Sequence, residues 1–334
     1  MTRVAVDAMG GDNAPGEIVA GALEAAAAGV DVTLYGPAGL DTGGLELVET
    51  TTTIGMADKP AEAVRAKPGS SLVSAIRAVA DGSADAVVSA GNTGAVLAAG
   101  LLHLRRLPGV LRPAIAVPIP TRSGPSLLID GGANADCRAE YLLQFAVMGS
   151  VFCHEILGIA DPSVRLLSIG EEPEKGDALR IEAHGLLREA EGIRFEGNAE
   201  ARDLLRGAAD VVVSDGFTGN MALKLLEGTI KELLDLLREE ISATPTGKLG
   251  GLLIRPAARR IRARLDPDTY GGAYLLGLRG LPVIGHGSSG RRAVANAISL
   301  AAKGAELGIV ERLAERLPSR ERQPADAVVV EEVR

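Results

Sequence analysis

The stretch GAADVVVSDGFTGNMALKLLEG, residues Gly207–Gly228, decides how this chain folds. Its β-branched apolar run predicts a buried strand over Asp210–Val213, the polar residues Ser214–Gly219 predict a turn, and Leu and Lys at helical spacing predict a helix from about Asn220. A second copy, GSADAVVSAGNTG, begins 125 residues earlier at Gly82 and matches nine of the first thirteen positions. The sequence therefore predicts two equivalent strand–loop–helix corners.

Both corners share the core V-V-S-x-G-x-T-G. In one open α/β sheet, each corner would direct loop amides, a serine, a threonine and a helix N-terminus toward the carboxyl edge, where such sheets bind ligands. An anion is the ligand that these groups favour. The simpler interpretation is that the glycines only permit tight turns between a strand and a helix.

Composition narrows the class of protein. The 334 residues are 46% apolar but only 2% aromatic, without Trp, so the core must be built from small aliphatic side chains, as in parallel strands covered by helices. A formal charge of −8 argues against a nucleic-acid partner. Cys137 and Cys153 read as buried small hydrophobic residues. Neither a signal peptide nor an apolar run of roughly 18 residues is recognisable.

Two further strands end in polar turns. Val4–Asp7 leads into DAMGGDNAP, where Asp7, Asp12 and Asn13 could orient a ligand or a metal but are equally suited to turns and helix caps. Leu127–Asp130 leads into GGAN, where the same choice between binding and capping stays open.

Two more loops carry candidate polar ligands. GHGSSG at Gly285–Gly290 formally matches a dinucleotide fingerprint but lacks the following strand with its acidic residue, so we interpret it as an anion-binding corner with His286 and Ser288. In IGEEPEKGD, Lys175 either holds an anion or belongs to a solvated run of charges, and the residues alone favour the solvated run.

The segment Lys248–Arg264 holds six basic residues and no acidic one. An apolar stripe runs beside the arginines, which is typical of a helix that lies on an anionic membrane or meets an acidic partner. An ordinary surface helix is the alternative. The leucines just before the arginines favour an exposed role.

Together the motifs VDAMGGDNAP, SAGNTGA, RPAIAVPIP, LIDGGAN, QFAVMG, IGEEPEKG, FEGN, DVVVSDGFTGN, GGAYLLGLRG and GHGSS, spread over residues 4–290, resemble the phosphate acyltransferase (PlsX) family of bacterial phospholipid synthesis. The resemblance implies a three-layer α/β/α sandwich with a mostly parallel sheet, similar to phosphotransacetylases and isocitrate-type dehydrogenases, with a protruding helical tip. It implies transfer of an acyl chain from acyl carrier protein to orthophosphate. It also implies a homodimer at the inner face of the cytoplasmic membrane, which passes acyl-phosphate to a membrane glycerol-3-phosphate acyltransferase.

The resemblance and the motifs together assign roles, with no cofactor and no metal ligand. We expect an α/β domain over 1–316, a basic amphipathic tip over 241–270 and a charged, mobile tail over 317–334. One departure is that Asn13 stands where the family commonly has His, which weakens a role for this side chain as proton acceptor. Candidate catalytic residues are Lys175, Asp215 and His286; candidate substrate ligands are Ser89, Gly91, Asn92, Thr93, Asn134, Ser214, Gly216, Thr218, Asn220 and Ser288; candidate membrane contacts are Leu249, Leu252, Leu253, Ile254, Arg255 and Arg259.

Three other functions stay open. An acyltransferase that uses acyl-CoA differs only in its donor, which the residues do not distinguish. A nicotinamide-dependent dehydrogenase is favoured only by GHGSSG, and a non-catalytic lipid- or carrier-binding protein would have no reason to duplicate the V-V-S-x-G-x-T-G corner.

Overall fold

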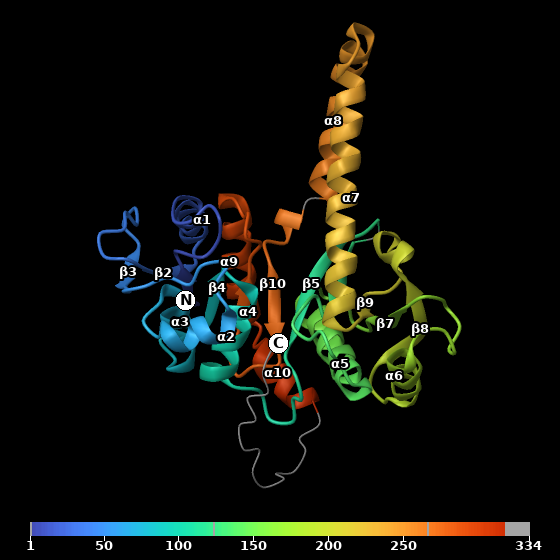
Figure 1. Cartoon of the computed structure of the whole chain (residues 1–334), viewed down its shortest axis with the longest axis horizontal. Coiled ribbons are helices and arrows are strands. Elements are labelled where there is room, and N and C mark those ends of the chain that lie inside the picture. The colour runs from blue at the N-terminus through green and yellow to red at the C-terminus, as the bar shows by residue number, and fades with distance from the viewer. Residues whose placement is uncertain (1, 123, 266, 318–334) are drawn as a thin grey trace.

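A computed structural model describes residues 2–122, 124–265 and 267–317. These residues form one 11-stranded sheet in the order β3-β2-β1-β4-β11-β10-β5-β6-β9-β7-β8 (Figure 1). The strands are β1 (Arg3–Asp7), β2 (Asp31–Gly36), β3 (Glu46–Glu49), β4 (Ala86–Ser89), β5 (Ala114–Pro120), β6 (Pro125–Ile129), β7 (Ser163–Ser168), β8 (Arg194–Glu200), β9 (Val211–Val213), β10 (Ala273–Leu276) and β11 (Pro282–Ile284).

The sheet consists of two parallel halves that run in opposite directions. Strands β3, β2, β1, β4 and β11 are parallel to one another, and so are β6, β9, β7 and β8. Between them, β10 pairs antiparallel with both β11 and β5, and β5 pairs antiparallel with β6. The carboxyl ends of the two halves therefore lie at opposite edges of the sheet.

Helices cover both faces of this sheet, so the predicted three-layer α/β/α architecture is confirmed. One face packs against α1, α5, α6, α9 and α10; the other packs against α2, α3 and α4 in one half and against η2 and the base of α7 in the other half. The helices are α1 (Gly16–Ala27), α2 (Pro60–Ala66), α3 (Ser71–Ala80), α4 (Thr93–Ala99), the π-helical turn η1 (Gly100–Leu104), α5 (Ala139–Glu155), α6 (Ala178–Glu189), the 3-10 turn η2 (Ala201–Arg206), α7 (Gly216–Ser242), α8 (Pro245–Leu265), the 3-10 turn η3 (Pro267–Thr269), α9 (Arg291–Glu306) and α10 (Ile309–Arg316).

Strand alternation explains how short apolar runs fill two cores. In β1, Val4 and Val6 belong to one face and Ala5 to the other, because successive side chains of a strand point to opposite sides. One aromatic pair lies where a helix meets the sheet: Phe152 of α5 packs edge-on against Tyr274 of β10, with ring centroids 5.3 Å apart. The core is otherwise aliphatic, as the composition predicts.

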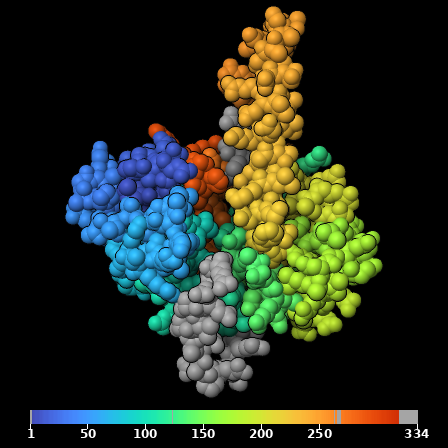
Figure 2. Space-filling view, in the orientation of Figure 1, coloured from blue at the N-terminus to red at the C-terminus, as the bar shows by residue number. Residues whose placement is uncertain are grey.

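Helices α7 and α8 form a hairpin that projects from the body (Figures 1 and 2). The hairpin contains the predicted basic tip, but it begins much earlier, since α7 runs without interruption from Gly216 to Ser242. Pro256 lies inside α8. The tail predicted over 317–334 lies, except for Leu317, outside the described residues.

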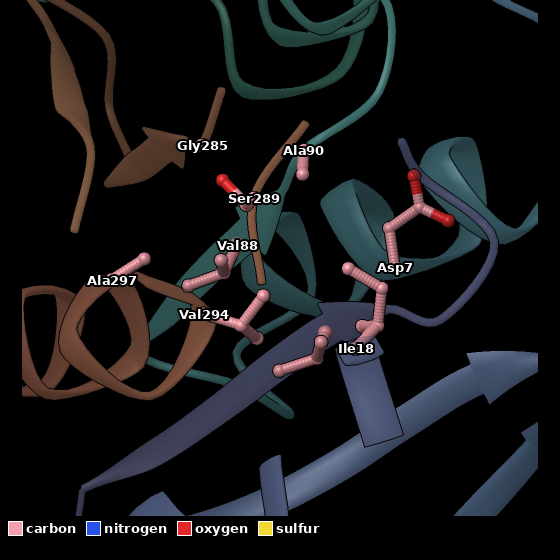
Figure 3. Close-up of a pocket in the computed structure, with 9 residues that line it drawn as sticks. Asp7, Ile18, Val88, Ala90, Gly285, Ser289, Val294 and Ala297 are labelled. Carbon is pink, nitrogen blue, oxygen red and sulfur yellow. The ribbon is translucent and has the colours of Figure 1, made fainter. Parts of the chain in front are cut away.

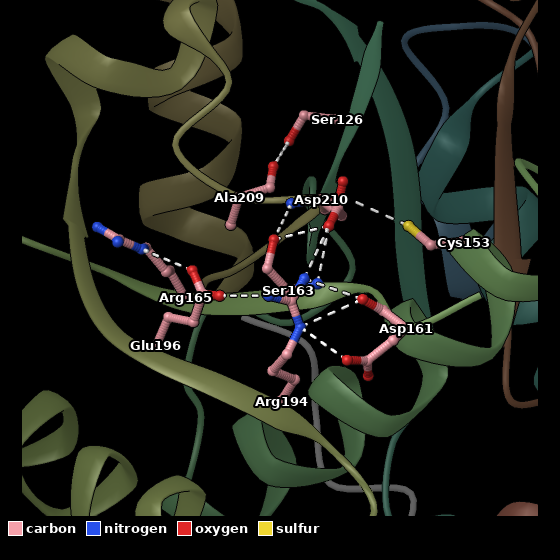
Figure 4. Close-up of polar contacts among 9 residues, drawn as sticks. All are labelled: Ser126, Cys153, Asp161, Ser163, Arg165, Arg194, Glu196, Ala209 and Asp210. Atoms are coloured by element: carbon pink, nitrogen blue, oxygen red, sulfur yellow. Dashed lines mark hydrogen bonds and ion pairs between the residues drawn. The ribbon is translucent and has the colours of Figure 1, made fainter. Parts of the chain in front are cut away.

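A polar network joins the amino ends of β7, β8 and β9 (Figure 4). The Asp210 carboxylate accepts hydrogen bonds from the backbone N–H of Ser163 at 2.8 Å and from its hydroxyl at 2.7 Å. Arg194 donates to the carbonyl of Asp161 and pairs with Glu196. These bonds lie at the amino ends of the strands, at the opposite end from the Asp130–Asn134 and Ser214–Asn220 loops, so we assign the network to the stability of the outer strands.

Candidate functional site

The first group of site residues, the Ser89 cluster, comprises Asp7–Asn13, Ser89–Thr93 and Gly285–Gly290. These segments follow β1, β4 and β11, which are neighbouring parallel strands. The structure therefore brings together three motifs that are far apart in the sequence. Three helices, α1, α4 and α9, begin directly after these segments, so their N-termini share this edge of the sheet. Helix N-termini attract anions through free amide groups and the helix dipole.

Asp7 forms the floor of the Ser89 cluster. The Ser89 hydroxyl donates to Asp7 Oδ2 at 2.7 Å and accepts from the backbone N–H of Gly91 at 3.1 Å. Burial raises the pKa of Asp7, and hydrogen bonds from Ser71, Ser89 and Met9 only partly offset this effect. A side chain at Gly10 would come within 2.8 Å of the Asp7 carboxyl, the Ser89 hydroxyl and the Gly91 amide, which explains the glycine. Asp7 therefore holds Ser89 and the following loop in place.

The loop after β11 carries the exposed side chains of this cluster. The His286 ring nitrogen Nδ1 lies 2.8 Å from the Ser288 hydroxyl, and both side chains are exposed. Asn13 donates its amide to the carbonyls of Ser288, at 3.1 Å, and Ser289, at 3.3 Å. Asn13 thus fixes the loop by donating hydrogen bonds, a role that needs no proton acceptor.

Ser289 points inward instead. Its hydroxyl is buried without a hydrogen-bond partner among the described residues, and it borders a small cavity together with Asp7, Val88 and Val294 (Figure 3). The buried side of the cluster is thus mostly apolar, and its accessible polar groups lie at the surface.

Asn92 is already engaged within the protein. Its Oδ1 accepts from the backbone N–H of Ala95 at 3.1 Å, which caps α4, and its amide donates to the carbonyls of Met56 and Asp58. Thr93, the next residue, is exposed at the start of α4. The structure therefore gives Asn92 a positioning role and leaves Thr93 accessible to a ligand.

The second group, the Ser214 cluster, comprises Asp130–Asn134 and Ser214–Asn220, which follow the paired strands β6 and β9. Asp130 is fully buried and accepts hydrogen bonds from the backbone N–H groups of Ile115, Gly132, Ala133 and Asn134. Burial raises the pKa of Asp130, and these bonds partly offset the rise. Of the two interpretations that the sequence left open for GGAN, the structure favours an internal cap.

Arg180 is a residue of this cluster that the sequence analysis missed. It lies in the first turn of α6, forms ion pairs with Asp215 and Asp177, and donates to the Thr218 hydroxyl at 2.9 Å. Asp215 also caps α7 by accepting from the backbone N–H of Thr218 at 2.9 Å. Nothing in the local sequence links an arginine of α6 to a loop 35 positions later. Asp215 and Thr218 are consequently occupied by contacts within the protein.

The remaining residues of the second cluster vary in exposure. The Ser214 hydroxyl is buried and has no hydrogen-bond partner among the described residues. Asn220 is exposed, and Asn134 donates its amide to both Asp130 and the carbonyl of Pro113. The backbone N–H of Gly216 donates to the carbonyl of Asn134 at 2.7 Å, so that amide is not available to a ligand.

Lys175 lies in the loop between β7 and α6, and its side chain is exposed. Asn198 holds this loop by donating to the carbonyl of Glu172 at 2.8 Å, and the buried His184 lies 3.1 Å from Asn198 Oδ1. This exposure agrees with the interpretation that Lys175 belongs to a solvated run of charges.

The two clusters do not meet at one edge of the sheet. Four strands separate β4 from β9, which corresponds to about 24 Å across the sheet, and the two strands run in opposite directions. The expectation that Ser89, Ser214 and His286 converge at one rim is therefore wrong within one chain. Ser89 and His286 share an edge, and Ser214 lies at the opposite edge.

The loop after β11 does not lead into a dinucleotide unit. In the described part of the chain, α9 is followed by α10 and not by a strand. A Rossmann fingerprint requires that strand to bring an acidic residue to the ribose. The dehydrogenase alternative loses its single supporting motif.

Comparisons with known proteins add independent information. A model of the family described as "Fatty acid synthesis protein" matches residues 2–312. The chain is 46% identical over 329 residues to a phosphate acyltransferase of Desulfitobacterium hafniense (strain Y51), covering 95% of this chain and 98% of that protein. It is 48% identical over 330 residues to a phosphate acyltransferase of Synechococcus sp. (strain JA-2-3B'a(2-13)), covering 96% and 88%.

Solved structures share the fold at much lower identity. The EutD phosphotransacetylase from Staphylococcus aureus superposes with a TM-score of 0.59 at 17% identity, covering 91% of this chain and 94% of that chain. A branched-chain phosphotransacylase from Enterococcus faecalis V583 gives the same TM-score of 0.59 at 17% identity, covering 91% and 99%. These similarities establish the fold class alone.

Proposed function

The chain belongs to the fatty acid synthesis protein family and is a phosphate acyltransferase, and from this premise we propose that it transfers a fatty acyl chain from acyl carrier protein to orthophosphate. The product, acyl-phosphate, would serve phospholipid synthesis through a membrane glycerol-3-phosphate acyltransferase. The observation that carries the proposal is the Ser89 cluster, where three helix N-termini and an exposed His286 lie at one edge of the sheet.

The chemistry needs no nucleophile from the protein. An oxygen of orthophosphate attacks the thioester carbonyl, a C–O bond forms, the C–S bond breaks, and the carrier leaves as a thiolate that takes up a proton. The protein must hold phosphate near the carbonyl and stabilise the negative charge of the tetrahedral intermediate, which one well-placed donor does by roughly 3–4 kcal/mol. We assign phosphate binding to Thr93, Ser288 and the first amides of α4. The first amide of α9, that of Arg291, already donates to Glu17 Oε2 at 2.7 Å.

His286 is the candidate for proton transfer. Its ring is exposed and lies beside Ser288, so it can orient phosphate or accept its proton. Asp7 stays behind the site, where its buried carboxyl supports Ser89 and the glycine loop. At the surface of the cluster the acceptor phosphate meets the hydroxyls of Thr93 and Ser288 and the His286 ring, and the exposed Asp12 carboxylate lies beside Gly287.

The Ser214 cluster is left out of this assignment. Arg180 already pairs with Asp215 and Thr218, and the Gly216 amide is bonded to Asn134. An anion there would have to displace contacts within the protein, whereas the Ser89 cluster offers the exposed side chains of Thr93, His286 and Ser288.

Trapping acyl-phosphate as its hydroxamate tests the proposal. Purified protein is supplied with orthophosphate and with either acyl carrier protein or acyl-CoA as the donor. Formation of hydroxamate that depends on orthophosphate and prefers the carrier-bound donor supports the proposal. An equal or better rate with acyl-CoA supports the alternative donor, and no hydroxamate with either donor contradicts the reaction.

We further propose that the hairpin of α7 and α8 contacts an anionic membrane. Leu249, Leu252, Leu253 and Ile254 are exposed on α8, and Arg255 and Arg259 follow on the same helix. Apolar side chains next to arginines suit the boundary between lipid headgroups and acyl chains. This placement would make the enzyme a peripheral protein of the inner membrane face.

The described residues include no single helix that is long and apolar enough to cross a membrane. The bent pair α9–α10 passes a test of length and composition, but many of its apolar side chains are buried in the core.

A homodimer is the third part of the proposal. Large apolar side chains are exposed along α7, from Phe217 and Met221 at its base to Leu233, Leu236 and Leu237 further along. Contiguous exposed apolar surface commonly marks a protein interface. A second copy of the chain would cover this surface, which we call the α7 face.

A further inference from the structure

Five arginines form an exposed patch at the edge of the sheet opposite the Ser89 cluster. We call Arg77, Arg105, Arg106, Arg112 and Arg279 the arginine patch; all five are exposed. Two hydrogen bonds to backbone carbonyls hold its centre together. The backbone N–H of Arg279 donates to the carbonyl of Arg105 at 3.0 Å, and its side-chain Nε donates to the carbonyl of Arg106 at 3.2 Å. Three separate segments of the chain thus present their guanidinium groups on one surface.

The positive charge of the patch is not neutralised by ion pairs. Throughout residues 2–122, 124–265 and 267–317, none of the five arginines pairs with a carboxylate at 4.0 Å or less. Asp81, one turn beyond Arg77, accepts hydrogen bonds from Ser83 instead. Burial, and then the charge of Arg77, lower the pKa of His103 nearby. Arg106 donates to the carbonyls of Val110 and Leu111, and Arg112 lies over the Tyr141 ring, contacts that do not neutralise charge. A protein with a net charge of −8 therefore concentrates positive charge without carboxylate partners at this place.

Arg105 is held in a backbone conformation that favours glycine. Its φ of 64° and ψ of 166° fall in a region that residues with a side chain rarely adopt. It is the one residue other than glycine with positive φ in the described chain. Its backbone is also held on both sides, since its N–H donates to the carbonyl of Gly100 and its carbonyl accepts from Arg279, both at 3.0 Å. The exposed guanidinium group of Arg105 therefore starts from a fixed point of the chain.

The patch also has an apolar contact point. Leu102, in the π-helical turn that precedes Arg105, is 53% exposed. Arginines around an exposed leucine match the composition of protein interfaces, in which Arg is enriched and apolar side chains occupy the centre.

The position of the patch favours a protein partner over a membrane. Strand β10 runs away from the hairpin tip in Figure 1, and Arg279 follows its carboxyl end. The patch therefore faces away from the hairpin that we assign to the membrane. From this arrangement we propose that the arginine patch docks the acidic surface of the acyl carrier protein that delivers the acyl chain.

This inference rests on the proposed function, and the fold gives it a route to the site. Helix α4 and the turn η1 run from the Ser89 cluster to the patch, a length of about 18 Å for twelve helical residues. A carrier protein presents its thioester at the end of a long flexible arm, so its docking surface does not need to touch the reacting atoms. Opposite charges would also speed the encounter, an effect that salt weakens.

Charge reversal at the patch tests the proposal. Binding of purified carrier protein is measured for the full-length protein, for the double variant Arg106→Glu/Arg279→Glu and for the control Arg188→Glu, an exposed arginine of α6. We expect the double variant to bind at least about tenfold more weakly, the control to bind within about twofold of the wild type, and 0.5 M salt to remove most of the difference. Thermal unfolding of each variant shows whether the fold is kept.

Arg105→Gly provides a second variant that the backbone tolerates. It removes the guanidinium group from a position suited to glycine, so we expect unchanged or higher thermal stability together with weaker carrier binding. Equal carrier binding by the wild type and all patch variants overturns the proposal, and so does a loss of binding to anionic vesicles without a loss of carrier binding. Hydroxamate formation by the wild type is a separate measurement, so failure of the reaction and failure of the docking surface are distinguishable.

Discussion

Asp7 and Asp130 show how buried carboxyl groups organise the loops that follow β1 and β6. Each is raised in pKa by burial and accepts hydrogen bonds from the loop that follows its strand. A charged carboxylate would repel a substrate anion. Burial favours the neutral form of both carboxyls, which lowers this repulsion. Both residues act mainly through the loops that they hold.

Asp7→Asn should change how stability depends on pH. Because the folded-state pKa of Asp7 is raised, its contribution to stability is present below the ordinary pKa near 3.8 and is lost as pH rises through the folded pKa. Asparagine does not titrate. As pH rises through that window, the free energy of unfolding of the wild type should therefore fall relative to that of the variant, by up to about 1.4 kcal/mol per pH unit. Denaturant unfolding at several pH values measures the difference. A constant difference from pH 4 to pH 8 would contradict the assignment.

His286 and Asn92 should separate turnover from stability. Alanine at His286 removes an exposed ring, so we expect kcat to fall by about 10²-fold or more with little change in Tm.

Alanine at Asn92 removes the cap of α4 and two hydrogen bonds to the loop of Met56 and Asp58, so it should cost about 1–2 kcal/mol of stability. Turnover assays and thermal unfolding on both variants check this, and unchanged turnover of His286→Ala would remove His286 from the site.

At the scale of elements, the base of α7 depends on glycine for close packing. A Cβ at Gly219 would lie 2.1 Å from the carbonyl oxygen of Asp130, so the helix could not approach β6 as closely. Gly228, on the same helix and beside Leu233 of the α7 face, has no atom of its own chain within 4 Å of such a Cβ. One helix thus offers both a constrained and an unconstrained glycine.

Alanine substitutions at these two glycines should act in opposite directions. Gly219→Ala should destabilise the protein by several kcal/mol, because a buried overlap with backbone forces the helix to shift. Gly228→Ala should stabilise it by up to about 1 kcal/mol, since alanine is the better helix former. Chemical denaturation measures both values; similar stability of the two variants would show that α7 is not packed as described.

The hairpin offers a test of membrane contact. Leu252→Ser/Leu253→Ser should weaken binding to anionic vesicles by about tenfold while acyl-phosphate formation in solution is kept, because the apolar area is lost far from the Ser89 cluster. Ile181→Ser, at an exposed isoleucine of α6, is the matched control. Vesicle sedimentation gives the bound fraction, and equal binding of all three proteins would refute the contact.

At the scale of the whole molecule, the reversal of strand direction separates the two corners. Strands β10, β5 and β6 introduce the antiparallel pairs that turn the second half around. The two copies of the corner therefore do not contribute ligands to one site within a chain. Within one chain the fold produces one cluster with several exposed side chains and one in which Asp215, Thr218 and the Gly216 amide are bonded within the protein.

The proposed homodimer is tested by mass in solution. Met221→Glu/Leu225→Glu places two charges on the α7 face, and we expect the dimer to dissociate because burying unpaired charge is unfavourable. Light scattering or analytical ultracentrifugation at micromolar concentration checks the result. A monomeric wild type, or a double variant that stays dimeric, would place the interface elsewhere.

Much of the architecture could be predicted from local pattern. Apolar β-branched runs and glycine turns predicted the strands β1, β6 and β9 close to their observed bounds, since these signals arise within a few residues. Strand β10 was not predicted, because its partners β11 and β5 come from different parts of the chain and its antiparallel direction has no local signal. The ion pair of Arg180 with Asp215 was not predicted either, because its two residues lie 35 positions apart and no local signal links them.

The amino-acid sequence by itself determined the layered α/β class, the small aliphatic core and the polar loops at the strand ends, because these follow from side-chain chemistry at short spacing. Only the tertiary structure decided which loops share an edge, since strand order and direction depend on pairing between distant segments. That pairing places Asp7, Ser89 and His286 together and sets Ser214 apart. It also gathers five arginines from three segments onto one surface, which no stretch of the sequence displays.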